Sequence, residues 1–227
     1  MSIAHFPTVS LPWIEEVVSH ARILDPEIKI NFDTNGFPAR ESFRRILNFS
    51  DSVTFDIKAF NDDVHRALTG APLEPVLRNA ETIARHPTEL WEYRILVIPS
   101  IVDIDEVQQI CEFIAGLGEA LPVCFLAFRP NYCLENHPGA PQKLMEQCLA
   151  IGAKSGLENV HWAGETDLKG KKIGGFYSDE PKIAHEGVRV AMEYASRVGC
   201  KKKPRNCGQC QLRLNCHLKA YKPGRTT

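Results

Sequence analysis

The sequence predicts an α/β fold built on a parallel sheet, followed by a small C-terminal region with four metal-binding cysteines. Two observations carry this prediction. Strand-like segments alternate four times with segments of helical periodicity that are long enough for crossovers, which is typical of right-handed βαβ units. Half of the eight cysteines fall between residues 200 and 216. The predicted domains are residues 1–163, which form the sheet and its helices, and 164–227, which form a last helix and the Cys-rich region.

The individual elements are predicted from hydrophobic spacing and from turn-forming residues. Strands are expected at residues 28–33, 52–58, 90–99, 122–128 and 159–163. Helices are expected at residues 11–24, 41–47, 62–68, 75–85, 107–118, 141–155 and 181–198. The segment PVCFLAF at 122–128 is apolar throughout, which predicts a strand that is buried on both faces.

Composition limits the class of protein. Among the 227 residues, 44% are hydrophobic and 24% are charged, as in ordinary globular proteins. No apolar run is long enough to cross a bilayer, and no basic-then-apolar leader opens the sequence, so we expect no membrane partner and a cytoplasmic location. In a reducing compartment, clustered thiols favour metal ligation over disulfides.

Four cysteines near the C-terminus are the strongest chemical signal in the sequence. Cys200, Cys207, Cys210 and Cys216 have the spacing C-x6-C-x2-C-x5-C. Two residues between thiolates let both sulfurs reach one ion, and Gly208 frees the backbone for that turn. The spacing fits a zinc ion held by four thiolates, and it also fits a [4Fe–4S] cluster. By contrast, Cys111, Cys124 and Cys148 are predicted to be small core residues.

The C-terminal region is also strongly basic. Eight of the 27 Lys and Arg residues, and none of the 28 Asp and Glu residues, follow residue 199. These cations could offset the negative charge of a thiolate-ligated centre, which is the interpretation we favour. The alternative is a zinc knuckle that binds nucleic acid, with the α/β body as its scaffold.

Polar side chains are expected at the carboxyl ends of the predicted strands, where parallel α/β folds bind ligands. The candidates, in chain order, are Asp33, Thr34, Asn35, Asp56, Lys58, Arg94 and Arg129. Carboxylates beside Lys and Arg suit a zwitterionic ligand: the acids contact an ammonium or hydroxyls, and the cations contact a carboxylate. The alternative is that these are polar side chains of strand ends with no ligand. No catalytic residue is assigned.

Three segments resemble successive strands of one enzyme family: NFDTNGF at 31–37, SVTFDIKAF at 52–60 and EYRILVIPSIVD at 92–103. The family is the radical S-adenosylmethionine (radical SAM) superfamily, and the resemblance points to activases of glycyl radical enzymes and to peptide-modifying members. It covers roughly residues 8–130 and implies a truncated (β/α)6 barrel with strands 3–6 present. It also implies S-adenosylmethionine as cofactor and a peptide or protein as substrate. The four C-terminal cysteines resemble an auxiliary-cluster domain, which favours [4Fe–4S] over zinc.

The resemblance also assigns roles to the strand-end residues. Asp33 of the D-T-N-G group would lie beside S-adenosylmethionine. Asp56 and Lys58 would lie near the methionine part of the cofactor or an associated cation. Arg94 would reach the cofactor from the following strand. Arg129 occupies a position where relatives have a cofactor-contacting side chain of another type.

The sequence departs from the family in its first residues. It has no C-x3-C-x2-C spacing for a catalytic cluster, and at 4–8 it reads AHFPT in place of the Gly-Gly-Glu-Pro run. We therefore expect the C-terminal part of a longer enzyme, whose missing portion or full-length homologue would be a partner. Four thiolates close a cluster that needs an open iron, so the chain alone is predicted to be inactive. The strand at 28–33 is predicted to be an unpaired apolar edge that promotes association.

Overall fold

The structure is a computed structural model that describes residues 2–3, 10–86, 89–130, 134 and 137–166. Two predictions lie outside these residues: the helix at 181–198, and the metal site formed by the four cysteines of the C-terminal region. The division into two domains therefore stays a prediction.

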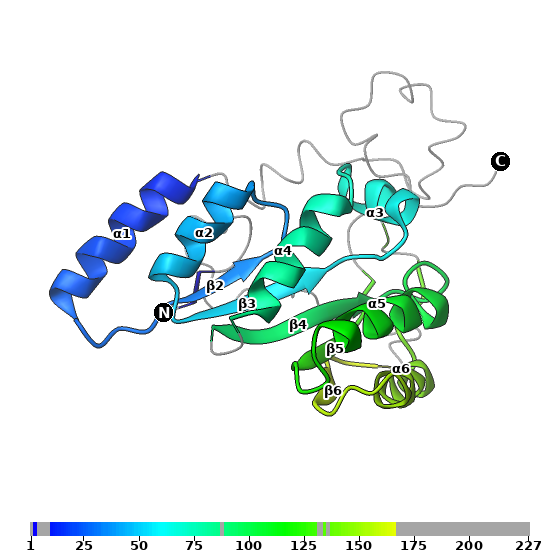
Figure 1. Cartoon of the computed structure of the whole chain (residues 1–227). Coiled ribbons are helices and arrows are strands. Elements are labelled where there is room, and N and C mark those ends of the chain that lie inside the picture. The colour runs from blue at the N-terminus through cyan, green and yellow to red at the C-terminus, as the bar shows by residue number, and fades with distance from the viewer. Residues whose placement is uncertain (1, 4–9, 87–88, 131–133, 135–136, 167–227) are drawn as a thin grey trace, which may run out of the picture.

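Six parallel strands form a single sheet in the part of the chain that the structure describes (Figure 1). Their spatial order is their order in the sequence. The strands are β1 (Ser2–Ile3), β2 (Asn31–Thr34), β3 (Ser52–Ile57), β4 (Leu90–Val97), β5 (Val123–Ala127) and β6 (Val160–Ala163). Each crossover thus steps in the same direction, and right-handed crossovers of this kind place the connecting helices on one face of the sheet.

Six helices connect the strands, and every helix predicted within the described residues is present. They are α1 (Leu11–Leu24), α2 (Arg40–Phe49), α3 (Asp62–Thr69), α4 (Glu74–Ala84), α5 (Ile104–Leu117) and α6 (Gln142–Lys154). Most ends differ from the prediction by one to three residues, which is usual because helix ends fray. Among the described residues, no helix combines the length and the apolarity that a membrane span requires. The cytoplasmic location stays a prediction.

The core lies between the helices and the helix-facing side of the sheet. Alternate residues of neighbouring strands point to this side, and Phe32, Phe55, Tyr93 and Phe125 are fully buried there. The rings of Phe55 and Tyr93 meet edge to face, with centroids 5.6 Å apart. The Tyr93 hydroxyl donates a 2.7 Å hydrogen bond to the carbonyl of Ala80 in α4, so the one polar atom of this ring is satisfied.

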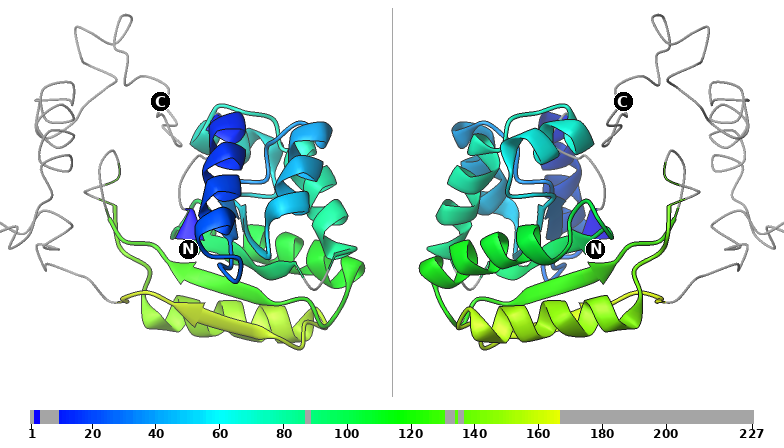
Figure 2. Two further views of the ribbon diagram at one scale, coloured as in Figure 1. Left: turned by 90° about the vertical axis from the view of Figure 1, so that its left-hand side faces the viewer. Right: turned by 90° about the vertical axis from the view of Figure 1, so that its right-hand side faces the viewer.

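The opposite side of the sheet is the inner, concave side, and the six helices of the described residues do not cover it (Figures 1 and 2). Its side chains are the intervening residues of the same strands, and many are polar and half-buried rather than apolar and buried. The sequential strand order, the helices on one side and the polar inner side together make this an open, partial (β/α) barrel. The predicted fold class is confirmed.

The prediction of an unpaired edge strand is wrong. Strand β2 begins at Asn31 rather than at residue 28, and Ser2–Ile3 of β1 pairs with it in parallel. The preceding residues form a turn instead, in which the amide of Ile28 donates to the carbonyl of Asp25 at 3.2 Å. The amide of Ile30 donates to the Asp51 carboxylate at 2.9 Å. Local hydrogen bonds thus replace strand pairing at residues 28–30, and β1 pairs with Asn31 and Phe32.

Candidate functional site

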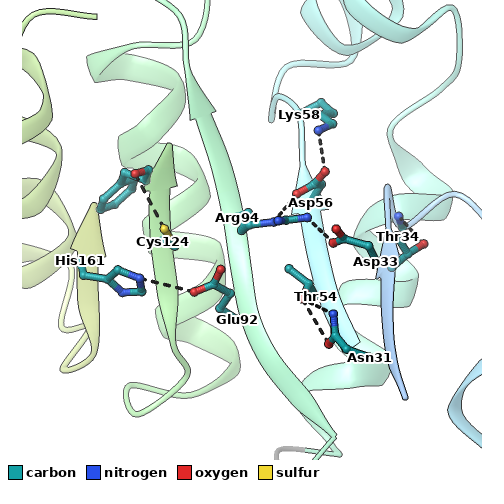
Figure 3. A network of polar contacts seen from close by, with 12 residues as sticks. Asn31, Asp33, Thr34, Thr54, Asp56, Lys58, Glu92, Arg94, Cys124 and His161 are labelled. Carbon is teal, nitrogen blue, oxygen red and sulfur yellow. Dashed lines mark hydrogen bonds and ion pairs between the residues drawn. The ribbon is translucent and has the colours of Figure 1, made fainter. Parts of the chain in front are cut away.

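Arg94 connects three strands on the inner side of the sheet (Figure 3). From the middle of β4 its guanidinium donates to Asp33 on β2 and, over 3.0 Å from Nε to Oδ1, to Asp56 on β3. The ammonium of Lys58, just beyond the end of β3, lies 2.7 Å from the other oxygen of Asp56. The structure therefore brings four of the predicted site residues into one ion-pair network.

Strand register explains this convergence. Asp56 stands directly opposite Arg94 in the β3–β4 pairing, and Asp33 stands opposite Thr54 in the β2–β3 pairing. Since side chains alternate between the two sides of a strand, Thr54, Asp56 and Lys58 share the inner side. The polar layer continues toward the strand starts, where the amide nitrogen of Asn31 donates to Thr54 over 3.1 Å.

The network is shielded from solvent but remains accessible. The side chains of Asp33, Asp56 and Arg94 are 12%, 18% and 21% exposed. Burial alone lowers the pKa of Arg94, but its hydrogen bonds and charge interactions with the two aspartates outweigh this and raise the pKa. The guanidinium has five N–H donors, so contacts with two carboxylates leave donors for a further acceptor. Such a group of paired charges can bind a zwitterion by exchanging partners.

The D-T-N-G group forms a tight turn directly after Asp33. The amide of Gly36 donates to the Thr34 hydroxyl at 3.1 Å, and the amide of Phe37 donates to the side-chain oxygen of Asn35 at 3.2 Å. Gly36 has a φ of 72°, which a residue with a side chain rarely adopts. Thr34 and Asn35 thus support the turn and stand apart from the ion-pair network. Their contact with a cofactor stays a prediction.

Arg129 follows the end of β5 and is also separate from the network. Its guanidinium lies 3.8 Å from the carboxylate of Glu165, and both side chains are exposed. Its role stays a prediction.

The sequence reasoning missed a second group on the inner side, formed by Glu92, Cys124 and His161. The Glu92 carboxylate lies 3.4 Å from the imidazole of His161. The ligand atoms of all three residues lie within 4.8 Å of one another. Glu92 could have been placed here, because it precedes Arg94 by two residues on the same strand. Cys124 is buried, as predicted, but its thiol faces this group rather than the helices (Figure 3).

Burial changes the titration of this second group. It raises the pKa of Glu92 above its ordinary value, against the smaller lowering effects of His161 and Arg94. Burial also raises the pKa of the Cys124 thiol to about 12. A carboxyl and a thiol whose charged forms are disfavoured would both gain from a nearby cation.

Comparison with known families agrees with the geometry. The model of the radical SAM superfamily matches residues 4–114, which include Asp33, Asp56, Lys58 and Arg94. Over these residues the chain is similar to the radical SAM superfamily. The matched residues include β2, β3 and β4, the three strands that the contacts of Arg94 connect.

Proteins similar to this chain include pyruvate formate-lyase-activating enzymes. It is 30% identical over 131 residues to an uncharacterized protein of Methanocaldococcus jannaschii, covering 56% of this chain and 38% of that protein. It is 29% identical over 99 residues to pyruvate formate-lyase 1-activating enzyme of Escherichia coli K12, covering 42% and 40%. It is 26% identical over 117 residues to pyruvate formate-lyase-activating enzyme of Staphylococcus aureus USA300, covering 49% and 46%. The chain thus spans less than half of the length of these relatives.

A solved structure supports the fold. A domain of pyruvate-formate lyase-activating enzyme from Bacteroides vulgatus superimposes with a TM-score of 0.62 at 18% identity, and the match covers 72% of this chain and 98% of that chain. At this identity the likeness concerns the fold alone.

Proposed function

We propose that this chain provides the S-adenosylmethionine-binding inner side of a radical SAM enzyme that modifies a peptide or protein. The observation that carries the proposal is the convergence of Asp33, Asp56, Lys58 and Arg94 on one side of the sheet. The protein substrate is supported by two relatives that are named for activating an enzyme, pyruvate formate-lyase.

The described side chains fit the cofactor. S-adenosylmethionine carries an ammonium, a carboxylate, a sulfonium and ribose hydroxyls. Asp33 and Asp56 can accept from the ammonium or the hydroxyls, while Lys58 and Arg94 can donate to the carboxylate. The half-buried position of the network strengthens each of these interactions relative to water. When bound, the cofactor supplies radical chemistry.

The described residues do not fit the catalytic iron–sulfur cluster. Their cysteines are Cys111 in α5, Cys148 in α6 and Cys124 on β5, all buried and on different elements. We therefore propose that the chain alone does not cleave S-adenosylmethionine. In the C-terminal region we propose an auxiliary [4Fe–4S] cluster on the four cysteines spaced C-x6-C-x2-C-x5-C.

Equilibrium dialysis of the full chain with S-adenosylmethionine tests the cofactor proposal. Arg94→Gln removes both ion pairs, and loss of a charge-assisted hydrogen bond worth about 1.5–3 kcal/mol should raise the Kd by about tenfold or more. Arg45→Gln is the matched control, because Arg45 forms a similar ion pair with Glu15 between α1 and α2. The proposal fails if the wild-type chain does not retain the cofactor, or if both variants bind it equally.

Anaerobic purification tests the auxiliary cluster. A brown protein with about four irons per chain, lost when the four C-terminal cysteines are replaced by serine, would support it. A colourless protein with one zinc would instead favour a knuckle. Production of 5′-deoxyadenosine by the reconstituted chain with dithionite would refute the proposed inactivity.

A further inference from the structure

The geometry points to a second, unassigned metal site: we propose that Glu92, Cys124 and His161 bind a divalent transition-metal ion such as Zn²⁺. The three residues come from β4, β5 and β6, three consecutive strands of the sheet. They supply one oxygen, one sulfur and one nitrogen, a set that suits zinc and its neighbours better than magnesium or calcium. None of the three residues takes part in the ion pairs of Asp33, Asp56, Lys58 and Arg94.

The distances fit a metal with four ligands. In a tetrahedral zinc site with bonds of about 2.05 Å to nitrogen and oxygen, these two atoms stand about 3.4 Å apart. The Glu92 oxygen and the His161 nitrogen are separated by 3.4 Å. The corresponding distance from sulfur to either atom is about 3.6 Å. Because all ligand atoms already lie within 4.8 Å of one another, shifts of no more than about 1.2 Å complete the arrangement.

Backbone register holds the ligands in place. Cys124 stands directly opposite His161 in the β5–β6 pairing, and Arg94 stands directly opposite Cys124 in the β4–β5 pairing. Glu92 is two residues before Arg94 and therefore faces the same side. Ligands on paired strands need little ordering when they bind, in contrast to ligands on loops.

The local charge favours a cation. Along this part of the inner side, the carboxylates of Asp33, Asp56 and Glu92 face the cations of Lys58 and Arg94. The carboxyl groups therefore outnumber these two cations by one, and the one nearest the proposed site, Glu92, pairs with the imidazole of His161. Coordination would release the thiol proton of Cys124 to solvent and would pair the resulting thiolate with the metal.

The solvent exposure of the ligands distinguishes this site from a structural metal site. The Glu92 side chain is 15% exposed and the His161 side chain 57% exposed, so solvent reaches the group from the β6 side. Three protein ligands leave a fourth position for water or a substrate group, which is the arrangement of catalytic zinc sites. The alternative to a metal site is an ion pair of Glu92 with His161 beside a thiol that binds nothing.

Cobalt titration of the full chain tests the proposal. Cys200, Cys207, Cys210 and Cys216 are first replaced by serine, so that the C-terminal thiols contribute nothing. This tail-serine variant should bind one Co²⁺ with a sulfur-to-cobalt charge-transfer band. Adding Cys124→Ser should abolish the band, and adding His161→Gln should weaken binding at least tenfold, since even residues behind the ligands change affinity by about 10–100-fold.

Cys148→Ala is the matched control, because it removes an equally buried thiol that is not part of the group. It should leave the band unchanged. The proposal is overturned if the tail-serine variant shows no band, or if the band survives Cys124→Ser and so belongs to another thiol. Circular dichroism checks that each variant is folded. If Cys124→Ser does not fold, His161→Gln decides, because its side chain is largely exposed, and undiminished cobalt affinity there refutes the site.

Discussion

Replacing Gly36 by alanine should destabilise the chain far more than the same change at Gly70, although both glycines have nearly the same backbone angle. Their φ values are 72° and 78°, and a left-handed conformation costs a residue with a Cβ about 1–2 kcal/mol. Around Gly70 an added Cβ meets nothing within 4 Å. At Gly36 it would lie 2.4 Å from the ring of Phe55 and 2.9 Å from a methyl group of Val76.

The Phe55 ring cannot move away easily. It is fully buried and packs edge to face against both Phe43 and Tyr93. Overpacking of this kind costs about 1–3 kcal/mol in addition to the backbone cost. We therefore expect Gly36→Ala to lower the free energy of unfolding by about 2–5 kcal/mol, and Gly70→Ala by about 1–2 kcal/mol.

Urea denaturation followed by circular dichroism measures both free energies. Both substitutions lower the conformational entropy of the unfolded chain by the same amount, so this stabilising effect cancels in the difference between the two free energies of unfolding. That difference then reports the clash with Phe55 alone. If Gly36→Ala costs no more than Gly70→Ala, the D-T-N-G turn does not pack closely against Phe55 of β3, and the reasoning is refuted.

Three further predictions concern single buried or half-buried groups. The hydrogen bond from the Ile30 amide lowers the pKa of Asp51. Ionised Asp51 should therefore stabilise the fold above about pH 4, and this stabilisation should disappear as the pH falls through the lowered pKa of Asp51. In a plot of unfolding free energy against pH, Asp51→Asn should flatten the fall on the acid side. Tyr93→Phe leaves the bond to the Ala80 carbonyl unmade and should cost about 1–2 kcal/mol in urea denaturation. Glu106→Gln weakens two charge-assisted bonds to loop amides and should lower the thermal midpoint, whereas an unchanged midpoint would show that these bonds add nothing.

The sequence was sufficient for the elements but not for all of their pairings. Helical periodicity predicted α1 with its observed bounds, because its apolar residues recur at helical spacing and Pro26 follows its end. Strand β1 was missed because two residues carry no detectable alternation. The start of β2 was placed too early because Ile28 and Ile30 are apolar, although their amides donate to Asp25 and Asp51 and both residues precede the strand.

The ion-pair network could be anticipated only in part. Its members were found as polar residues at or within strands, and the rule that parallel strands present their carboxyl ends together grouped them. That Asp56 stands directly opposite Arg94 is a property of register, which a single sequence does not reveal. The same limit explains why Glu92, Cys124 and His161 were not grouped: they are 32 and 37 residues apart along the chain, and two strand pairings bring them together.

Register also links the stability of this chain to its chemistry. Phe55 and Tyr93 pack against the helices, while their neighbours Asp56 and Arg94 pair on the inner side. A shift of either strand by one residue would exchange these sets, burying charges beneath the helices and exposing aromatic rings on the inner side. Each charge that such a shift left buried and unpaired would cost several kcal/mol. The core thus fixes the register that the ion-pair network needs. The inner side can therefore hold a row of charged residues, because the apolar side of the same strands keeps them in place.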